Sequence, residues 1–464
     1  MSNSKAISAA DNQRPQHQCF EFVSHQLEGH ALRLHYRLTG GPDADQSFCE
    51  LLSLPETLPA PNPADPLIQA LLRACLFSFG VSYFKAALPK NILGPAISSD
   101  EADFWNLLYS EGMGEFYYRN GLPIPDTVGF EALVDRSLPS HTLLSAHRSN
   151  HERALVLIGG GKDSALVAEI VRESGIEAEA LSLGNSPWME CSAHASQLKL
   201  HRIGRQIDPA LLALNANGAW NGHIPISALI AALSSLISHA AGFSDILVGN
   251  ERGADDANTV WEGREINHQW SKSSLFEKQF QNWCSNHAPG APRYASLLRP
   301  LSEIRIAAQF SKCKNQLSAF TSCNRNFRIN ADERPARWCG KCAKCTFVAL
   351  ILAPHLSDTE QLAIFGQEIL AHHDNEPHLQ ALLGLSAVKP WDCVGTAKEC
   401  WLSLLQLHRQ GRLPASLNPL VSLAPNDLTG LGFDQAWAEE WHIHPSPLLS
   451  APWQTRLHAY LNAH

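Results

Sequence analysis

The sequence predicts an α/β protein whose central domain is a doubly wound parallel sheet. One observation is the run from Ala154 to Ile158, whose five consecutive apolar residues are typical of a strand buried on both faces. A second is the glycine turn after this run, which leads into a segment with helical spacing of apolar residues and a stop at Gly175. A third is that predicted strands and helices alternate from about residue 147, as they do in parallel sheets.

The N-terminal part of the chain predicts strands followed by helices. Apolar and polar residues alternate between Leu32 and Leu38, and the run 48–54 is expected to pair with them across a Gly-Gly-Pro turn. A proline-rich link then leads to an apolar helix over about 67–79, and Asp100 is the expected N-cap of a second helix. This part is therefore predicted to be an α+β domain.

The central part continues the alternation of strands and helices. Strands are predicted at 178–183, 198–207 and 245–249, and a buried helix at 224–241 precedes the last of them. Ligands of such sheets lie beyond the carboxyl ends of the strands. We therefore expect the loops that follow these ends to converge on one pocket, in which Asn185 contacts the ligand.

The glycine turn after the first of these strands predicts a phosphate-binding loop, because free backbone N–H groups before a helix bind anions. A Walker A loop has a hydroxyl residue directly after its lysine, whereas here Asp163 follows Lys162. The run instead resembles the S-G-G-x-D-S loop of the PP-loop ATP pyrophosphatases, which cleave ATP to AMP and diphosphate, with glycine at the first position. The alternative is a glycine-rich turn that binds nothing. The resemblance implies ATP contacts from Gly159, Gly160, Gly161, Lys162, Asp163 and Ser164.

An acidic turn, Asn250 to Asp256, follows the strand at 245–249. Its three carboxylates would repel one another beside a phosphate loop unless a hard cation neutralised them, and Mg²⁺ bound with ATP does so. We assign Asp255 and Asp256 to Mg²⁺ and Glu251 to the catalytic groups. The alternative is a solvated acidic turn, which is common in proteins.

The polar stretch from Glu265 to Ser274 supplies two further candidate catalytic residues. His268 and Lys272 are four positions apart, so they share a face if the segment is helical. Both carry groups that can transfer a proton or bind an anionic substrate. The alternative is the ordinary start of a surface helix.

Three cysteines form a C-x2-C-x2-C run at Cys339, Cys342 and Cys345, and Cys323 is available upstream as a fourth thiolate. Four thiolates make a tetrahedral structural Zn²⁺ site. A [4Fe–4S] cluster, a metal-free thiol cluster and a catalytic cysteine are the alternatives.

Composition narrows the class of protein. Hydrophobic content of 45% and charged content of 17% describe a globular protein, and a net charge of −9 argues against a nucleic-acid substrate. The cysteines are scattered, and the sequence predicts neither a signal peptide nor a membrane span. We therefore expect the protein in a reducing cytoplasm.

At 464 residues the chain is longer than one ordinary hydrophobic core requires, so more than one domain is predicted. The predicted limits are a disordered tail at 1–16, the α+β domain at 17–146, an ATP-binding domain at 147–335 and a cysteine-cluster and helical region at 336–464.

Together, these motifs resemble the MurL family of UDP-N-acetyl-α-D-muramoyl-L-alanyl-L-glutamate epimerases. The resemblance runs from about Leu71 to Cys393 and includes the stretches Ser82-Tyr-Phe-Lys85 and Lys389-Pro-Trp-Asp-Cys393. It implies a PP-loop, adenine nucleotide alpha hydrolase-like sheet. It also implies ATP-dependent inversion of the terminal L-glutamate of UDP-MurNAc-L-Ala-L-Glu through an acyl-adenylate, in peptidoglycan precursor synthesis.

The chemistry gives such an epimerase a reason to use ATP. A Cα–H bond beside a free carboxylate is hardly acidic, and transfer of AMP to the carboxylate removes the negative charge that opposes deprotonation. Two alternatives of other classes remain open. One is a PP-loop amide-forming ligase acting on a small acidic substrate through the same adenylate, and the other is a non-catalytic nucleotide-sensing module.

Overall fold

The computed structural model describes residues 14–131, 152–327 and 334–464. They form two compact units, each assembled from separate stretches of the chain. The predicted boundary at 146/147 and most of the predicted tail lie outside the described residues, so the predicted domain limits stay a prediction. The described stretches of the first unit are 14–131, 202–244 and 279–293, and those of the second are 152–201, 245–278, 294–327 and 334–464.

The first unit contains the predicted antiparallel strands, confirmed in register with Tyr36 opposite Phe48. Strand β1 adds an antiparallel neighbour to β2, and β4 pairs in parallel with β1. Arg205 and Gly204 of β7 (Leu200–Gln206) pair antiparallel with the end of β3. The other elements of this unit are β1 (Cys19–Glu28), β2 (Ala31–Thr39), β3 (Gln46–Ser53), β4 (Asn91–Leu93), α1 (Pro66–Phe84), α2 (Ser99–Ser110), α3 (Gly114–Asn120), α6 (Pro209–Ala216) and α7 (Ile226–Ala241).

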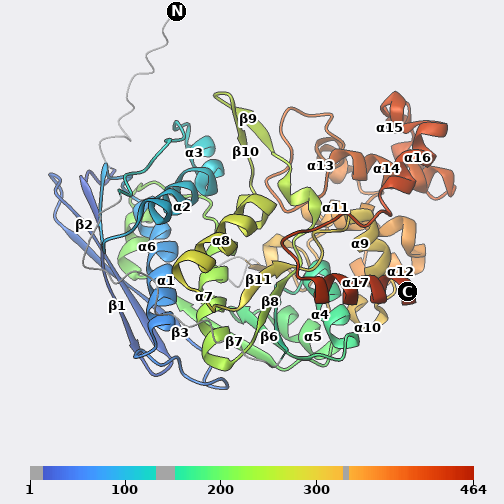
Figure 1. The fold of residues 1–464 in the computed structure, drawn as a ribbon. Coiled ribbons are helices and arrows are strands. Elements are labelled where there is room, and N and C mark those ends of the chain that lie inside the picture. Colours follow the sequence, from blue (N-terminus) through green and yellow to red (C-terminus); the bar gives the residue numbers. More distant parts are fainter. Residues whose placement is uncertain (1–13, 132–151, 328–333) are drawn as a thin grey trace, which may run out of the picture. The chain divides into compact units, whose positions relative to one another are not determined.

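Helix α1 is the core helix of this unit. It packs on β1, β2 and α7, and Figure 1 shows it beside the antiparallel strands. Among the described residues, α1 is the helix long and apolar enough to cross a membrane, but 83% of that stretch is buried inside the protein.

The prediction of Asp100 as the N-cap of α2 is wrong. Ser98 occupies the N-cap and its side chain accepts a hydrogen bond from Glu101 N, because Asp100 already lies within the first helical turn.

The second unit contains the predicted strand, glycine turn and helix. Strand β5 pairs in parallel with both β6 and β8, which confirms the parallel sheet in this part. Helix α4 begins at Lys162, earlier than the apolar spacing indicated, and is followed by Gly175 with a φ of +71°. The elements here are β5 (Arg153–Leu157), α4 (Lys162–Glu173), β6 (Glu177–Leu183), α5 (Pro187–Ala195), β8 (Asp245–Val248), β9 (Thr259–Trp261), β10 (Arg264–Ile266), α9 (Glu303–Phe310) and α10 (Lys314–Leu317).

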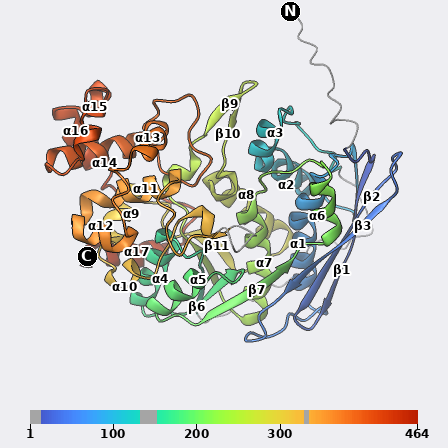
Figure 2. The same cartoon turned by 180° about the vertical axis from the view of Figure 1, so that it is seen from behind.

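The C-terminal part of this unit is helical, as predicted. Helix α11 is buried along its whole length and packs on α9, α13 and α14, so it lies at the centre of the core. Figure 2 shows these helices in orange and red. Helix α8 (Ser274–His287), strand β11 (Arg293–Ser296) and strand β7 have residues in both units. The C-terminal helices are α11 (Ala343–Leu352), α12 (Asp358–Phe365), α13 (Glu376–Leu382), α14 (Ala397–Arg409), α15 (Asn418–Val421), α16 (Leu431–Glu439) and α17 (Ala451–Ala463).

Candidate active site

The glycine loop lies between the end of β5 and the start of α4. Gly160 has a φ of +83°, a conformation that side chains disfavour, and a Cβ there would approach the backbone of Trp188 to 3.2 Å. Gly161 is the N-cap of α4 and has no side chain to cover the first-turn N–H groups. Ser164 Oγ accepts a hydrogen bond from Gly159 N at 3.3 Å, which closes the loop on itself. The loop therefore presents a helix N-terminus of the kind that binds anions.

Three carboxylates gather beside this loop. Oxygens of Asp163, Glu251 and Glu303 lie within 4.8 Å of one another. The ammonium of Lys162 is completely buried and bonds to Asp163 and Glu303. Burial alone would lower the pKa of Lys162, but these two carboxylates outweigh it and raise the pKa, so the lysine stays charged. This site, which we call the carboxylate cluster, combines three acids with one fixed cation.

Two features bring the acidic turn to the loop. Gly249 follows β8, and a Cβ there would lie 2.9 Å from the backbone of Asp163, so only glycine permits this approach. Arg299 is buried and donates to the backbone oxygens of Glu251, at 2.7 Å, and Lys272. It also forms an ion pair with Glu277 at 3.2 Å. One guanidinium thus fixes two loops that carry predicted catalytic residues.

The predicted residues His268 and Lys272 converge, although not on the face of an α-helix. Lys272 ends a short 3-10 turn (η4, Trp270–Lys272), and His268 precedes this turn. Both contact Cys393: Lys272 Nζ donates to its Sγ at 3.1 Å, and His268 forms a side-chain hydrogen bond with it. Burial alone would lower the pKa of Lys272, but the charges of Cys393 and Glu251 raise it.

The other predicted ligands lie at the surface. Asp255 and Asp256 are exposed, and Asp255 accepts a hydrogen bond from Ser274 N at 2.6 Å. Asn185 is exposed after β6. The structure therefore brings Glu251 to the glycine loop but places Asp255 and Asp256 outside the carboxylate cluster. Their role in binding Mg²⁺ stays a prediction.

The four predicted cysteines form one cluster in the second unit. The Sγ atoms of Cys323, Cys339, Cys342 and Cys345 lie within 4.8 Å of one another, and those of Cys339 and Cys345 are 3.8 Å apart. Backbone N–H groups donate to two of the sulfurs, from Lys341 to Cys339 and from Cys345 to Cys342, each at 3.4 Å.

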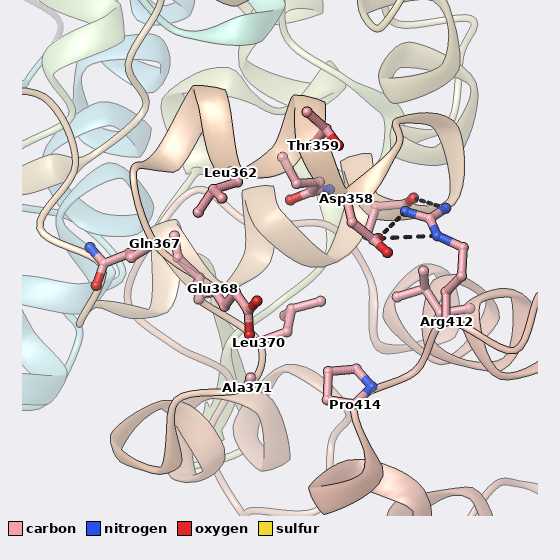
Figure 3. Close-up of a pocket in the computed structure, with 13 residues that line it drawn as sticks. Asp358, Thr359, Leu362, Gln367, Glu368, Leu370, Ala371, Arg412 and Pro414 are labelled. Atoms are coloured by element: carbon pink, nitrogen blue, oxygen red, sulfur yellow. Dashed lines mark hydrogen bonds and ion pairs between the residues drawn. The ribbon is translucent and has the colours of Figure 1, made fainter.

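A cavity of about 450 Å³ lies elsewhere, among the C-terminal helices (Figure 3). Its lining contains none of the residues that the sequence predicted for the site. Its charged lining residues are Asp358, Glu368 and Arg412, and Arg412 is paired with Asp358 at 2.6 Å. This cavity therefore contains fewer candidate functional residues than the region around the glycine loop.

Sequence reasoning missed three residues near the loop: Glu303, Lys344 and Cys393. Glu303 had a signal, since it ends the Arg299-Pro-Leu-Ser-Glu run that opens α9. Cys393 ends the Lys389–Cys393 stretch, which belongs to the resemblance to the MurL family but carried no predicted role. Lys344 lies inside the cysteine run, in which only the cysteines were predicted to have a function.

Comparisons with known proteins cover most of the chain. Residues 11–297 match the family model described as the MurL N-terminal domain, and residues 319–422 match that of the MurL C-terminal domain. Three curated relatives are named UDP-N-acetyl-alpha-D-muramoyl-L-alanyl-L-glutamate epimerase. The relative from Xanthomonas oryzae pv. oryzae is 38% identical over 72% of this chain and 73% of its own length. Those from Micromonospora sp. and Salinispora tropica are each 35% identical, over 88% and 84% of this chain and 91% and 85% of their own lengths.

Proposed function

The chain belongs to the MurL family, and from this membership we propose that it inverts the terminal L-glutamate of UDP-MurNAc-L-Ala-L-Glu to D-glutamate, releasing AMP and diphosphate from ATP. The observation that carries the proposal is the shared name of relatives that are 35–38% identical over most of the chain. Since ATP and the UDP-linked dipeptide are charged small molecules, we place the reaction in the cytoplasm, with neither nucleic acid nor membrane as partner.

ATP is proposed to bind with its phosphates at the glycine loop. The support is the N-terminus of α4, where the N-cap Gly161 makes no side-chain hydrogen bond although Ser322 Oγ accepts from Lys162 N at 3.4 Å, together with two buried hydroxyls at the carboxyl end of β6. Within the described part of the chain, Ser182 Oγ and Ser186 Oγ are buried without a hydrogen-bond partner. Buried polar groups are normally satisfied. Ser182 lies in β6 and Ser186 follows it, at the strand end beyond which ligands of such sheets bind.

The carboxylate cluster is proposed to hold Mg²⁺ through Asp163, Glu251 and Glu303. Carboxylate oxygens are the ligands that Mg²⁺ takes from proteins. When bound, Mg²⁺ neutralises phosphate charge and stabilises the diphosphate leaving group. Lys162 already neutralises part of the cluster, which keeps three acids together before any cation binds.

The four-cysteine cluster is proposed to hold one structural Zn²⁺. With Zn–S bonds of about 2.3 Å, the edges of a tetrahedron are about 3.8 Å long. The separation of Cys339 Sγ and Cys345 Sγ is 3.8 Å. The two N–H donors to Cys339 and Cys342 stabilise thiolates rather than thiols. Such a site would tie Cys323, after α10, to the start of α11.

In this proposal, activation precedes inversion. The substrate carboxylate attacks the α-phosphorus of ATP, diphosphate leaves, and the acyl-adenylate has a Cα–H bond acidic enough for a protein base. The neighbouring amide oxygen of L-alanine lies within reach of the activated carbonyl, so ring closure to an oxazolone is a second route to the same acidity. Both routes consume one ATP and end with hydrolysis of the activated carboxyl group.

Product analysis tests the proposal. Incubation with ATP, Mg²⁺ and UDP-MurNAc-L-Ala-L-Glu should give AMP and the D-glutamate diastereomer together. Omission of the dipeptide substrate should suppress AMP formation. AMP with retained L-configuration and a new amide would indicate the ligase, and absence of AMP with bound ATP would indicate the nucleotide sensor.

A further inference from the structure

The segment Lys389–Cys393 is held against the loop that carries His268. Asn258 forms the clamp: its Oδ1 accepts from His268 N at 2.8 Å, and its Nδ2 donates to Pro390 O at 2.8 Å. Asn258 O also accepts from Lys389 N at 3.0 Å. Asn258 itself is buried. One side chain thus connects two stretches that are far apart in the sequence.

The clamp places Cys393 between three groups that can carry positive charge. Lys272 Nζ donates to its Sγ at 3.1 Å, His268 forms a side-chain hydrogen bond with it, and Lys344 Nζ donates to its backbone oxygen. Burial alone would raise the pKa of the Cys393 thiol, but Lys272 and His268 outweigh it and lower the pKa to about 6. Burial instead raises the pKa of Cys284 to about 12. Cys393 is therefore largely a thiolate at neutral pH, and it is only half-buried.

The same lysines connect Cys393 to the carboxylate cluster. The charge of Lys272 acts on Asp163 and Glu251 as well as on Cys393. The charge of Lys344 acts on Asp163 and on Cys393. The thiolate and the proposed ATP site therefore share their cations, so a carboxylate activated at the glycine loop would lie within the same charged region.

We propose that Cys393 Sγ is the base that takes the Cα proton of the activated glutamate. This proposal rests on the proposed epimerisation. The lone pair of the thiolate takes the proton and forms S–H, and the electron pair of the C–H bond moves into the activated carbonyl group as an enolate. A proton from solvent then reaches the opposite face of Cα and forms the D-configured C–H bond. The thiol passes its proton through His268 to solvent, and nothing is oxidised or reduced.

Cys393→Ala separates this step from activation. With ATP, Mg²⁺ and UDP-MurNAc-L-Ala-L-Glu in D₂O, the variant should keep ATP–diphosphate exchange within about 3-fold of the wild type. It should lose about 10²–10⁴-fold in deuterium uptake at Cα and in formation of D-glutamate, the usual contribution of a general base. Cys19→Ala, on strand β1 of the first unit, is the matched control and should change neither rate.

The possible outcomes are distinguishable. Deuterium uptake at the wild-type rate in Cys393→Ala would overturn the assignment of the base, and so would a parallel loss of exchange and uptake in a variant that melts like the wild type. Absence of exchange and of AMP in the wild type would instead overturn the proposed function.

The pH dependence of the epimerisation rate is a second test, because a cysteine with only a structural role would not change it. The groups that face Cys393 are Lys272, His268, Lys344 and the neighbouring Asp392. The active form is the thiolate, which is populated above its pKa, so the epimerisation rate should fall about tenfold per pH unit below about pH 6. Alkylation of Cys393 by iodoacetamide should follow the same curve, and Lys272→Met should shift it toward higher pH. Alkylation with an apparent pKa above about 8 in the wild type, that of an ordinary thiol, would overturn the proposal.

Discussion

Asp163→Asn should lower the rate of AMP release by about 10²–10³-fold while the protein stays folded, the usual cost of removing one electrostatic group from a reaction centre. Asp163 is the member of the carboxylate cluster that lies on the first turn of α4, beside the glycine loop. Burial opposes its ionisation, but the ammonium groups of Lys162 and Lys344 outweigh this and lower its pKa, so it is charged at neutral pH. Asparagine keeps the shape and removes the charge.

The fold should survive because Lys162 keeps its second partner, Glu303. AMP formation is measured at saturating ATP, and the melting temperature is recorded on the same preparation. The matched control is Asp434→Asn, which removes an exposed carboxylate paired with Arg409 at 2.6 Å and should change the rate less than 2-fold, about the scale of a surface ion pair. Wild-type AMP release from Asp163→Asn would show that the carboxylate cluster is not the site of the ATP reaction.

Cys339→Ser should remove the bound zinc and destabilise the second unit before it affects catalysis directly. Purified wild-type protein should contain about one Zn²⁺ per chain, because the four sulfurs lie within 4.8 Å of one another and the pair Cys339–Cys345 has the 3.8 Å separation of a tetrahedral edge. Loss of one ligand releases the link between Cys323 and the start of α11, the helix at the centre of the core. Metal binding to a preformed site stabilises the folded state, so the melting temperature should fall by several degrees.

Metal analysis and thermal melting check this expectation. Cys313→Ser is the control: this half-buried thiol lies outside the cluster, near Gln309 O and Tyr460 OH, and its replacement should leave the zinc content unchanged. Iron with acid-labile sulfide would identify a [4Fe–4S] cluster instead. A metal-free wild type with the stability of Cys339→Ser would leave only a buried thiol cluster.

The strand, glycine turn and helix around residues 154–175 could be predicted because their signals are local. An apolar run, three glycines and helical spacing each act within a few residues. The antiparallel pairing of β2 and β3 was predictable for the same reason. The capping residue of α2 was not, because Ser98 and Asp100 are both good caps and the packing of the first turn decides between them.

The composition of the carboxylate cluster depends on contacts between distant stretches. Asp255 and Asp256 were predicted because they follow Glu251 closely, but they lie exposed at and just after the end of a short 3-10 turn, outside the cluster. The third carboxylate is Glu303, which the start of α9 places beside Lys162. No local pattern reveals that approach.

His268 and Lys272 were selected from their chemistry, and the structure brings them together by a different route than the one expected. A helix would have aligned them four residues apart, whereas here Asn258 and Arg299 fix the two residues by backbone contacts. Their common partner, Cys393, comes from a loop before α14 and could be found only from the folded chain.

The most direct test of the account follows oxygen from the substrate carboxylate into AMP. UDP-MurNAc-L-Ala-L-Glu is prepared with ¹⁸O in the carboxylate that becomes activated, and the AMP formed with ATP and Mg²⁺ in ordinary water is analysed by mass spectrometry. An acyl-adenylate, whether deprotonated directly or closed to an oxazolone, leaves its bridging oxygen on AMP, so each AMP should carry one ¹⁸O atom and each product a D-glutamate. AMP without ¹⁸O, or inversion without AMP, would contradict activation of the carboxylate by ATP.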